Sequence, residues 1–135
     1  MPILRRRFLK TSAAIGALLT GGKAVSAGGR FTGSGTPMAL ALTDALRKYD
    51  AAGAIGHAYL NAVPSERAIG RLRALIETAL ANGAGGRLDG DRLLRRFAEV
   101  RRHEFAAEDV AVVDGWVLSR TEARLYALRA LDRRP

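Results

Sequence analysis

One dipeptide, Asp114-Gly115, lies between two valine-rich runs and constrains the fold more than any other feature of the sequence. Glycine tolerates the positive φ of a type I′ turn, so this pattern predicts a β-hairpin over about 109–118. A lone two-stranded hairpin is marginally stable in water, and this one must therefore pack on other parts of the chain. Ser119 and Glu122 follow with the spacing of a capping box, which predicts that a helix begins directly after the hairpin.

The rest of the chain after about residue 37 has the periodicity of helices. The predicted helices cover 37–49, 50–63, 64–82, 92–105 and, after the hairpin, 120–134. Their expected apolar faces are Leu40, Ala41, Ala45 and Leu46; Ile55, Tyr59 and Ala62 or Val63; Ile69, Leu72, Ile76, Ala79 and Leu80; Leu93, Leu94, Phe97 and Val100; and Leu125, Leu128 and Leu131. Gly53 and Gly56 are expected to permit close approach of another helix, and Asp89 or Asp91 to cap the fourth helix. We therefore predict a mainly α fold, a small domain of four or five helices with a C-terminal hairpin that leads into the last helix.

The first 27 residues differ in composition from the rest. They hold five of the 22 Lys and Arg residues and no acid, so the remaining residues carry 17 bases against 13 acids. A positive segment ends at Lys10, a weakly apolar segment follows, and a small-residue segment ends at Ala27. This pattern is typical of a cleavable targeting peptide. We expect a leader over 1–27 with cleavage after Ala27, a flexible linker over 28–36 and one domain over 37–135.

Residues 5–10 read Arg-Arg-Arg-Phe-Leu-Lys. This stretch resembles the twin-arginine (Tat) signal peptides, whose pattern is an arginine pair, any residue and then Phe-Leu-Lys. The matching residues are Arg5, Arg6, Phe8, Leu9 and Lys10, and Leu4 departs from the Ser or Thr that usually precedes the pair. The resemblance covers about a fifth of the chain. It implies export to the periplasm or cell envelope by the Tat translocase of a protein that has already folded in the cytoplasm, either alone or with a partner. Retention of the leader as an anchor is the alternative to cleavage.

Chemistry-bearing residues are few. The chain has two histidines, His57 and His103. For His57, which is near Tyr59, we predict a solvated or locally hydrogen-bonded side chain, with a role as ligand or general base as the alternative. For His103, at the end of the basic helix, we predict a charged side chain that complements the helix dipole, with a site role as the alternative. No third ligand follows at regular spacing, so we predict no metal site. The chain has no cysteine, no nucleophile elbow and no phosphate-binding Lys-Ser/Thr pair, so we predict no catalytic residue and no cofactor.

The fourth predicted helix carries an arginine-rich face. A net charge of +9 would suggest a nucleic-acid partner, but acids interleave with these arginines and aromatics for base stacking are missing, so we predict no nucleic acid. The sole tryptophan, Trp116, follows the hairpin turn and is either a core anchor or a docking residue. The hypothetical partner surface consists of Trp116, Arg92, Arg95, Arg96, Arg101 and Arg102.

These observations favour an exported, non-enzymatic accessory or partner-binding protein of the cell envelope. The general plan resembles the small Tat-targeted subunits of membrane-bound dehydrogenases, which implies a co-exported oxidoreductase partner. Two alternatives stay open: a small periplasmic enzyme or ligand-binding protein that uses His57, Tyr59 or His103, and a peripheral binder of anionic membrane surfaces through the arginines.

Overall fold

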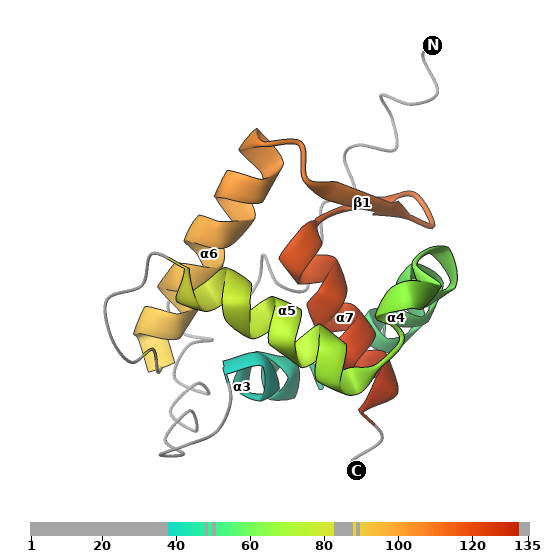
Figure 1. Ribbon diagram of the computed structural model, residues 1–135, viewed down its shortest axis with the longest axis horizontal. Coiled ribbons are helices and arrows are strands. Elements are labelled where there is room, and N and C mark those ends of the chain that lie inside the picture. The colour runs from blue at the N-terminus through green and yellow to red at the C-terminus, as the bar shows by residue number, and fades with distance from the viewer. Residues whose placement is uncertain (1–37, 48, 50, 83–87, 89, 133–135) are drawn as a thin grey trace.

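The fold is seen in a computed structural model that describes residues 38–47, 49, 51–82, 88 and 90–132 (Figure 1). Its elements in chain order are α3 (Met38–Ala45), α4 (Ala51–Ala62), the short 3-10 helix η2 (Pro64–Glu66), α5 (Ile69–Ala81), α6 (Gly90–Ala106), β1 (Val110–Val113), β2 (Trp116–Ser119) and α7 (Arg120–Leu131). The predicted fold class is confirmed: the described chain is mainly helical, and a two-stranded antiparallel hairpin precedes the last helix.

Helix α7 is the centre of the fold. It contacts α3, α4, α5, α6 and both strands, and Figure 1 shows it between α6 on one side and α4 on the other. A helix that is surrounded in this way is buried on several faces rather than along one stripe. Its buried residues are Thr121, Glu122, Ala123, Leu125, Tyr126, Ala127 and Leu128. The predicted face thus holds for two of its three leucines, whereas Leu131 is half-buried against the core.

The contact of α4 with α7 depends on one glycine. A Cβ at Gly56 would overlap the Tyr126 carbonyl oxygen and would lie 2.8 Å from Ala130 Cβ, so only glycine lets the two backbones approach this closely. Gly53 makes no such approach to another described element, because a Cβ there would meet no described atom within 4 Å beyond its chain neighbours and its own helix backbone. The buried residues of α4 are Ala52, Ile55, Gly56, Tyr59 and Leu60, whereas Ala62 is exposed and Val63 half-buried.

The hairpin and the capping box are confirmed. Asp114 has φ +48° and Gly115 has φ +82°, as a type I′ turn requires. The strands pair in the register Val113↔Trp116 through Val110↔Ser119. Ser119 Oγ accepts from the Glu122 backbone N–H, and Glu122 in turn accepts from the Ser119 backbone N–H. The box joins the end of β2 directly to the start of α7.

The predictions for the first and third helices need correction. In α3 the buried residues are Ala39, Leu42 and Thr43, whereas Leu40, Ala41 and Ala45 are half-buried. Leu46 is buried as predicted, but it lies in the turn that follows α3. The polar Thr43 fits inside because its Oγ1 donates to the Ala39 carbonyl at 2.7 Å. The helix predicted over 64–82 is interrupted after η2, since Ala68 is extended with ψ 127° and α5 begins only at the next residue.

Helix α5 buries Leu72, Ile76 and Leu80 as predicted, whereas Ala79 is half-buried. Ile69, at the first position of α5, remains 43% exposed and does not belong to the buried stripe.

Helix α6 places its predicted inward residues in the core, and Glu104 is buried among them. Of its two predicted caps, Asp91 lies inside the first turn, because Gly90, with φ +46°, is the first residue of the helix. Asp89, the other predicted cap, lies outside the described residues.

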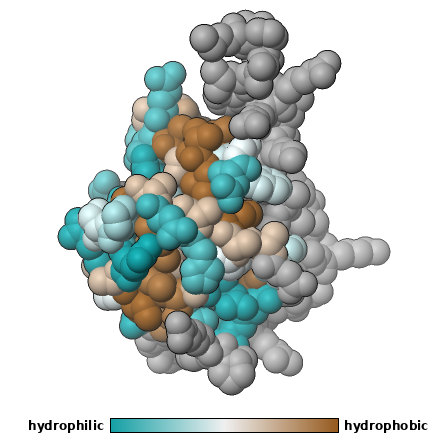
Figure 2. Space-filling model, turned by 90° about the vertical axis from the view of Figure 1, so that its right-hand side faces the viewer, coloured by the Kyte–Doolittle hydropathy of each residue, from teal (hydrophilic) through white to brown (hydrophobic). Residues whose placement is uncertain are grey.

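The surface on the side of α4 and the hairpin is mixed: Figure 2 shows hydrophobic side chains that reach solvent between hydrophilic ones. Among the large hydrophobic residues that the structure describes, only Ile69 and Val112 are exposed. No helix in the described ranges is long and apolar enough to cross a membrane.

Candidate functional site

The outward face of α6 carries three exposed arginines, Arg92, Arg95 and Arg102. At 100° per residue they lie on the side opposite to the buried Leu93, Phe97 and Val100. Across the described ranges, none of these three guanidinium groups makes an ion pair or a hydrogen bond. Among the described residues, nothing neutralises these three charges.

Arg96, although predicted as part of the same partner surface, holds the end of a neighbouring helix. Its Nε donates to the Leu80 carbonyl at 2.9 Å, and its guanidinium also donates to the Asn82 carbonyl. The last carbonyls of α5 have no partner within their own helix, and a cation there also suits the helix dipole. Arg96 further pairs with Glu99 at 3.3 Å. Arg96 therefore belongs to the fold and is not free to bind a partner.

Arg101 is also occupied within the protein. Its Nε lies 3.4 Å from Glu122 Oε2, and its guanidinium carbon lies 5.6 Å from the centre of the Phe105 ring. The side chain is only 18% exposed. Of the five arginines in the predicted partner surface, Arg92, Arg95 and Arg102 are thus the ones that make no ion pair or hydrogen bond among the described residues.

Of the two roles that the sequence left open for Trp116, the structure bears on that of a core anchor. It is half-buried, packs against the hydrophobic core and pairs with Val113 across the hairpin. Its indole therefore anchors the hairpin on the helices and leaves only part of its surface to solvent.

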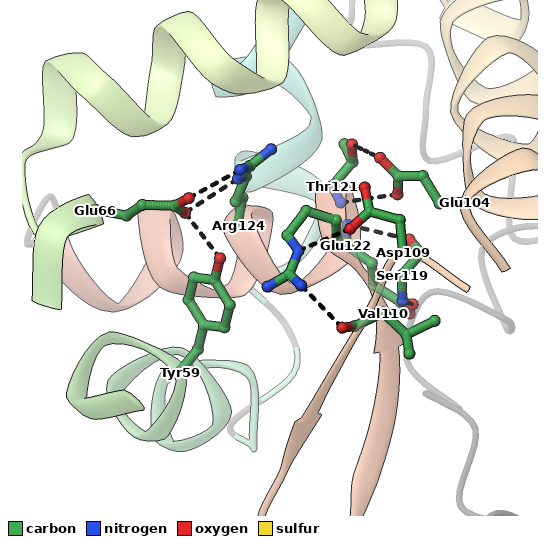
Figure 3. A network of polar contacts seen from close by, with 10 residues as sticks. Tyr59, Glu66, Glu104, Asp109, Val110, Ser119, Thr121, Glu122 and Arg124 are labelled. Carbon is green, nitrogen blue, oxygen red and sulfur yellow. Dashed lines mark hydrogen bonds and ion pairs between the residues drawn. The ribbon is translucent and has the colours of Figure 1, made fainter. Parts of the chain in front are cut away.

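A first polar cluster joins three elements beneath the surface (Figure 3). Arg124, from α7, makes a two-point contact with Glu66: its Nε lies 3.0 Å from Oε2 and its NH2 2.8 Å from Oε1. Tyr59, fully buried in α4, donates to Glu66 Oε2 at 2.8 Å. Arg124 lowers the pKa of Glu66, and burial raises the pKa of Tyr59. The cluster ties η2 to α4 and α7 through a carboxylate that stays ionised.

A second cluster surrounds the start of α7, at the other end of Figure 3. Glu104 accepts from the backbone N–H of Thr121 at 2.8 Å and from its hydroxyl at 2.5 Å. Arg120 donates to Asp109 at 3.2 Å and to the Val110 carbonyl at 3.0 Å. A carboxylate beside the first N–H groups of a helix satisfies their orphan donors and the helix dipole.

Glu122 is the unusual member of this second cluster. It is fully buried, and its Oε1 has no hydrogen-bond partner among the residues that the structure places. Burial raises its pKa to about 7, although the charge of Arg101 opposes that shift. The group therefore exchanges a proton near neutral pH in a position where it helps to begin the central helix.

The structure does not bring His57, Tyr59 and His103 together. His57 is exposed on α4 and His103 is exposed at the end of α6, and these helices lie on opposite sides of α7 (Figure 1). Tyr59 is buried and committed to Glu66. Within the described part of the chain, no group of three or more potential metal ligands occurs. The leader residues Arg5, Arg6, Phe8, Leu9, Lys10 and Ala27 lie outside that part.

Sequence reasoning missed Glu66, Glu104 and Arg124. A signal existed for Glu104, which continues the inward spacing of Phe97 and Val100 by one further turn. The pairing of Glu66 with Arg124 joins residues 58 positions apart, and no local pattern marks it. Comparison with models of protein families, with curated proteins and with solved structures gives no match to this chain.

Proposed function

We propose that this chain is a small exported accessory protein of the cell envelope that binds an acidic surface of a protein partner through Arg92, Arg95 and Arg102. The observation that carries the proposal is that these three exposed arginines have no partner among the described residues, whereas Arg96 and Arg101 on the same helix do. Guanidinium groups bind carboxylates in a two-point geometry, so Arg92, Arg95 and Arg102 suit a partner surface that is rich in Asp and Glu.

Arg92 and Arg95 are three positions apart on one exposed face of α6, where their like charges repel each other. Three exposed arginines that make no ion pair or hydrogen bond with any described residue support a role outside the fold. The resemblance of the leader to Tat signal peptides supports a partner that is exported in the folded state, and we favour an oxidoreductase subunit without a leader of its own.

The proposed export by the Tat route is tested by replacing the arginine pair of the leader. Replacing Arg5 and Arg6 with lysine in a fusion of residues 1–35 to a reporter that is active only after folded export is expected to abolish reporter activity in the periplasm. Lysine keeps the charge, so a loss reports recognition of the pair and not of charge alone.

The third arginine provides a matched control for the export test. In the twin-arginine pattern Arg7 occupies the variable position, so Arg7→Lys is expected to export as the unchanged leader does. Export that survives the double lysine change would contradict the proposal.

The partner-binding half is tested by removing the three charges together. In the full chain, Arg92→Gln, Arg95→Gln and Arg102→Gln are expected to weaken capture of the stoichiometric partner from envelope extracts about tenfold or more, because each exposed ion pair contributes modestly and three are lost. The unchanged protein should also lose its partner as salt rises.

The control removes one exposed arginine charge from another helix. Arg71 is exposed on α5, and Arg71→Gln is expected to leave partner capture unchanged. Recovery of the unchanged protein without any stoichiometric companion would refute the protein-partner proposal. Binding to anionic vesicles that the triple change abolishes would then assign the arginines to a membrane surface.

A further inference from the structure

The outer edge of β1 is open and apolar. The strand consists of Val-Ala-Val-Val, and Val112 is 66% exposed, more than any other large hydrophobic residue that the structure describes. Natural edge strands are normally protected by a short length, a charged residue, a proline or a bulge. β1 is short, with four residues, but between Val110 and Val113 it has no charged residue, proline or bulge.

The hydrogen-bond pattern of the hairpin shows which backbone groups face outward. The backbone N–H of Arg120 donates to the backbone carbonyl of Asp109 at 3.1 Å, so Asp109 and Arg120 form a hydrogen-bonded pair of the ladder. Hydrogen-bonded and non-hydrogen-bonded pairs alternate along an antiparallel ladder. The pairs Val110↔Ser119 and Val112↔Val117 are therefore non-hydrogen-bonded, and their N–H and C=O groups face away from the partner strand.

Most of these outward groups are covered or used within the protein. The Val110 carbonyl accepts from Arg120, and the Ser119 N–H donates to Glu122. Val117, on the outer edge of β2, is buried, with 6% exposure. Val112 differs, because its side chain is exposed, and its N–H and C=O face away from β2 and have no hydrogen-bond partner among the described residues. Among those residues, the accessible stretch of the β1 edge is centred on Val112.

We propose that a second copy of this chain pairs with this edge, with the two β1 strands antiparallel and Val112 opposite Val112 of the second copy. The N–H and C=O of each Val112 then bond to those of the other, and the two hairpins form one four-stranded sheet. A symmetric pairing of this kind uses the same patch on both copies.

Charge favours this register over its neighbour. Centred on Val112, the pairing places Asp114 of the second copy opposite Val110, beside the guanidinium of Arg120, and symmetry repeats this contact. Asp109 lies opposite Gly115 of the second copy, so no like charges meet. A register centred on Ala111 would instead place Asp114 opposite Glu108 of the second copy, which is unfavourable. Because the strands are short and bury little area, we expect a weak, concentration-dependent dimer.

The absence of cysteine allows a direct test of this geometry. In the full chain, Val112→Cys introduces the sole thiol, and Cα atoms opposite each other in a hydrogen-bonded antiparallel pair are about 5.5 Å apart, within the range of a disulfide. Under mild oxidation the variant is expected to form a covalent dimer about tenfold or more faster than Ile69→Cys, which places a thiol at the other exposed large hydrophobic residue. Equal rates for the two variants would overturn the proposal.

A second measurement uses the reversible dimer. Val112→Lys protects the edge with a charge and is expected to raise the dimer dissociation constant of the full chain about tenfold or more in sedimentation equilibrium. Ile69→Lys adds the same charge outside the edge and should leave that constant unchanged. A dimer that persists unchanged in Val112→Lys, or an unchanged chain that stays monomeric at millimolar concentration, would refute the proposed pairing.

Discussion

Replacing Gly56 with alanine is expected to lower the free energy of unfolding by about 3 kcal/mol, at the upper end of the range for overpacked interiors. The added Cβ would overlap the Tyr126 carbonyl and would lie 2.8 Å from Ala130 Cβ. Two of the three atoms that it meets belong to the backbone of α7, so no rotamer change relieves the overlap. Helices α4 and α7 must separate, and the interior between them loses its packing.

The same substitution at Gly53 is the matched control. Gly53 is in the same helix, and a Cβ there meets no described atom of another element within 4 Å. Gly53→Ala is therefore expected to stabilise the protein by about 0.5 kcal/mol, because alanine favours the helix more than glycine does. Urea unfolding followed by the fluorescence of the sole tryptophan measures both variants. Equal changes in the free energy of unfolding at the two positions would show that helix propensity, and not the contact with α7, determines the effect of the substitution.

The contrast between the two glycines illustrates what the sequence can predict. Asp114-Gly115 and the pair Ser119 and Glu122 act over two to four residues, and both were predictable because turn geometry and capping depend on neighbours in the chain. Helical spacing places Gly56, but not Gly53, on the face of α4 that carries Ile55 and Tyr59, so the sequence contains part of the difference. It does not contain the close approach of the Tyr126 carbonyl, which is 70 residues beyond Gly56 in the chain.

The arginines of α6 extend this conclusion to the candidate site. Arg95 and Arg96 are neighbours, and the sequence assigns both to one basic face. The structure separates them, because Arg96 points at the last carbonyls of α5 whereas Arg95 is exposed. Helical periodicity predicts on which side of its own helix a residue lies, but it does not predict what another helix places there. The basic helix was therefore predictable, and its division into structural and free arginines was not.

The pKa of Glu122 makes stability depend on pH in a definite direction. Burial raises this pKa from its ordinary value of 4.5 to about 7 in the folded protein. Between these values the folded state binds more protons than the unfolded state, so the free energy of unfolding falls as pH rises. The pKa of Glu66 shifts in the opposite direction, to below 4.5. Its contribution to the free energy of unfolding is therefore lost only as pH falls below about 4.5. Between pH 5 and pH 8 the slope therefore reports Glu122.

The expected result is a loss of about 3 kcal/mol of stability as pH rises from 4.5 to above 7, which Glu122→Gln removes. Glutamine also serves in a capping box, so the start of α7 is kept while the buried titratable group is lost. Urea unfolding of both proteins at intervals from pH 5 to pH 8 measures the slope. Glu99→Gln, at an exposed position of α6, should keep the slope of the unchanged protein. A slope that survives in Glu122→Gln would mean that another group takes up the proton, and that the capping carboxylate of α7 is charged throughout this range.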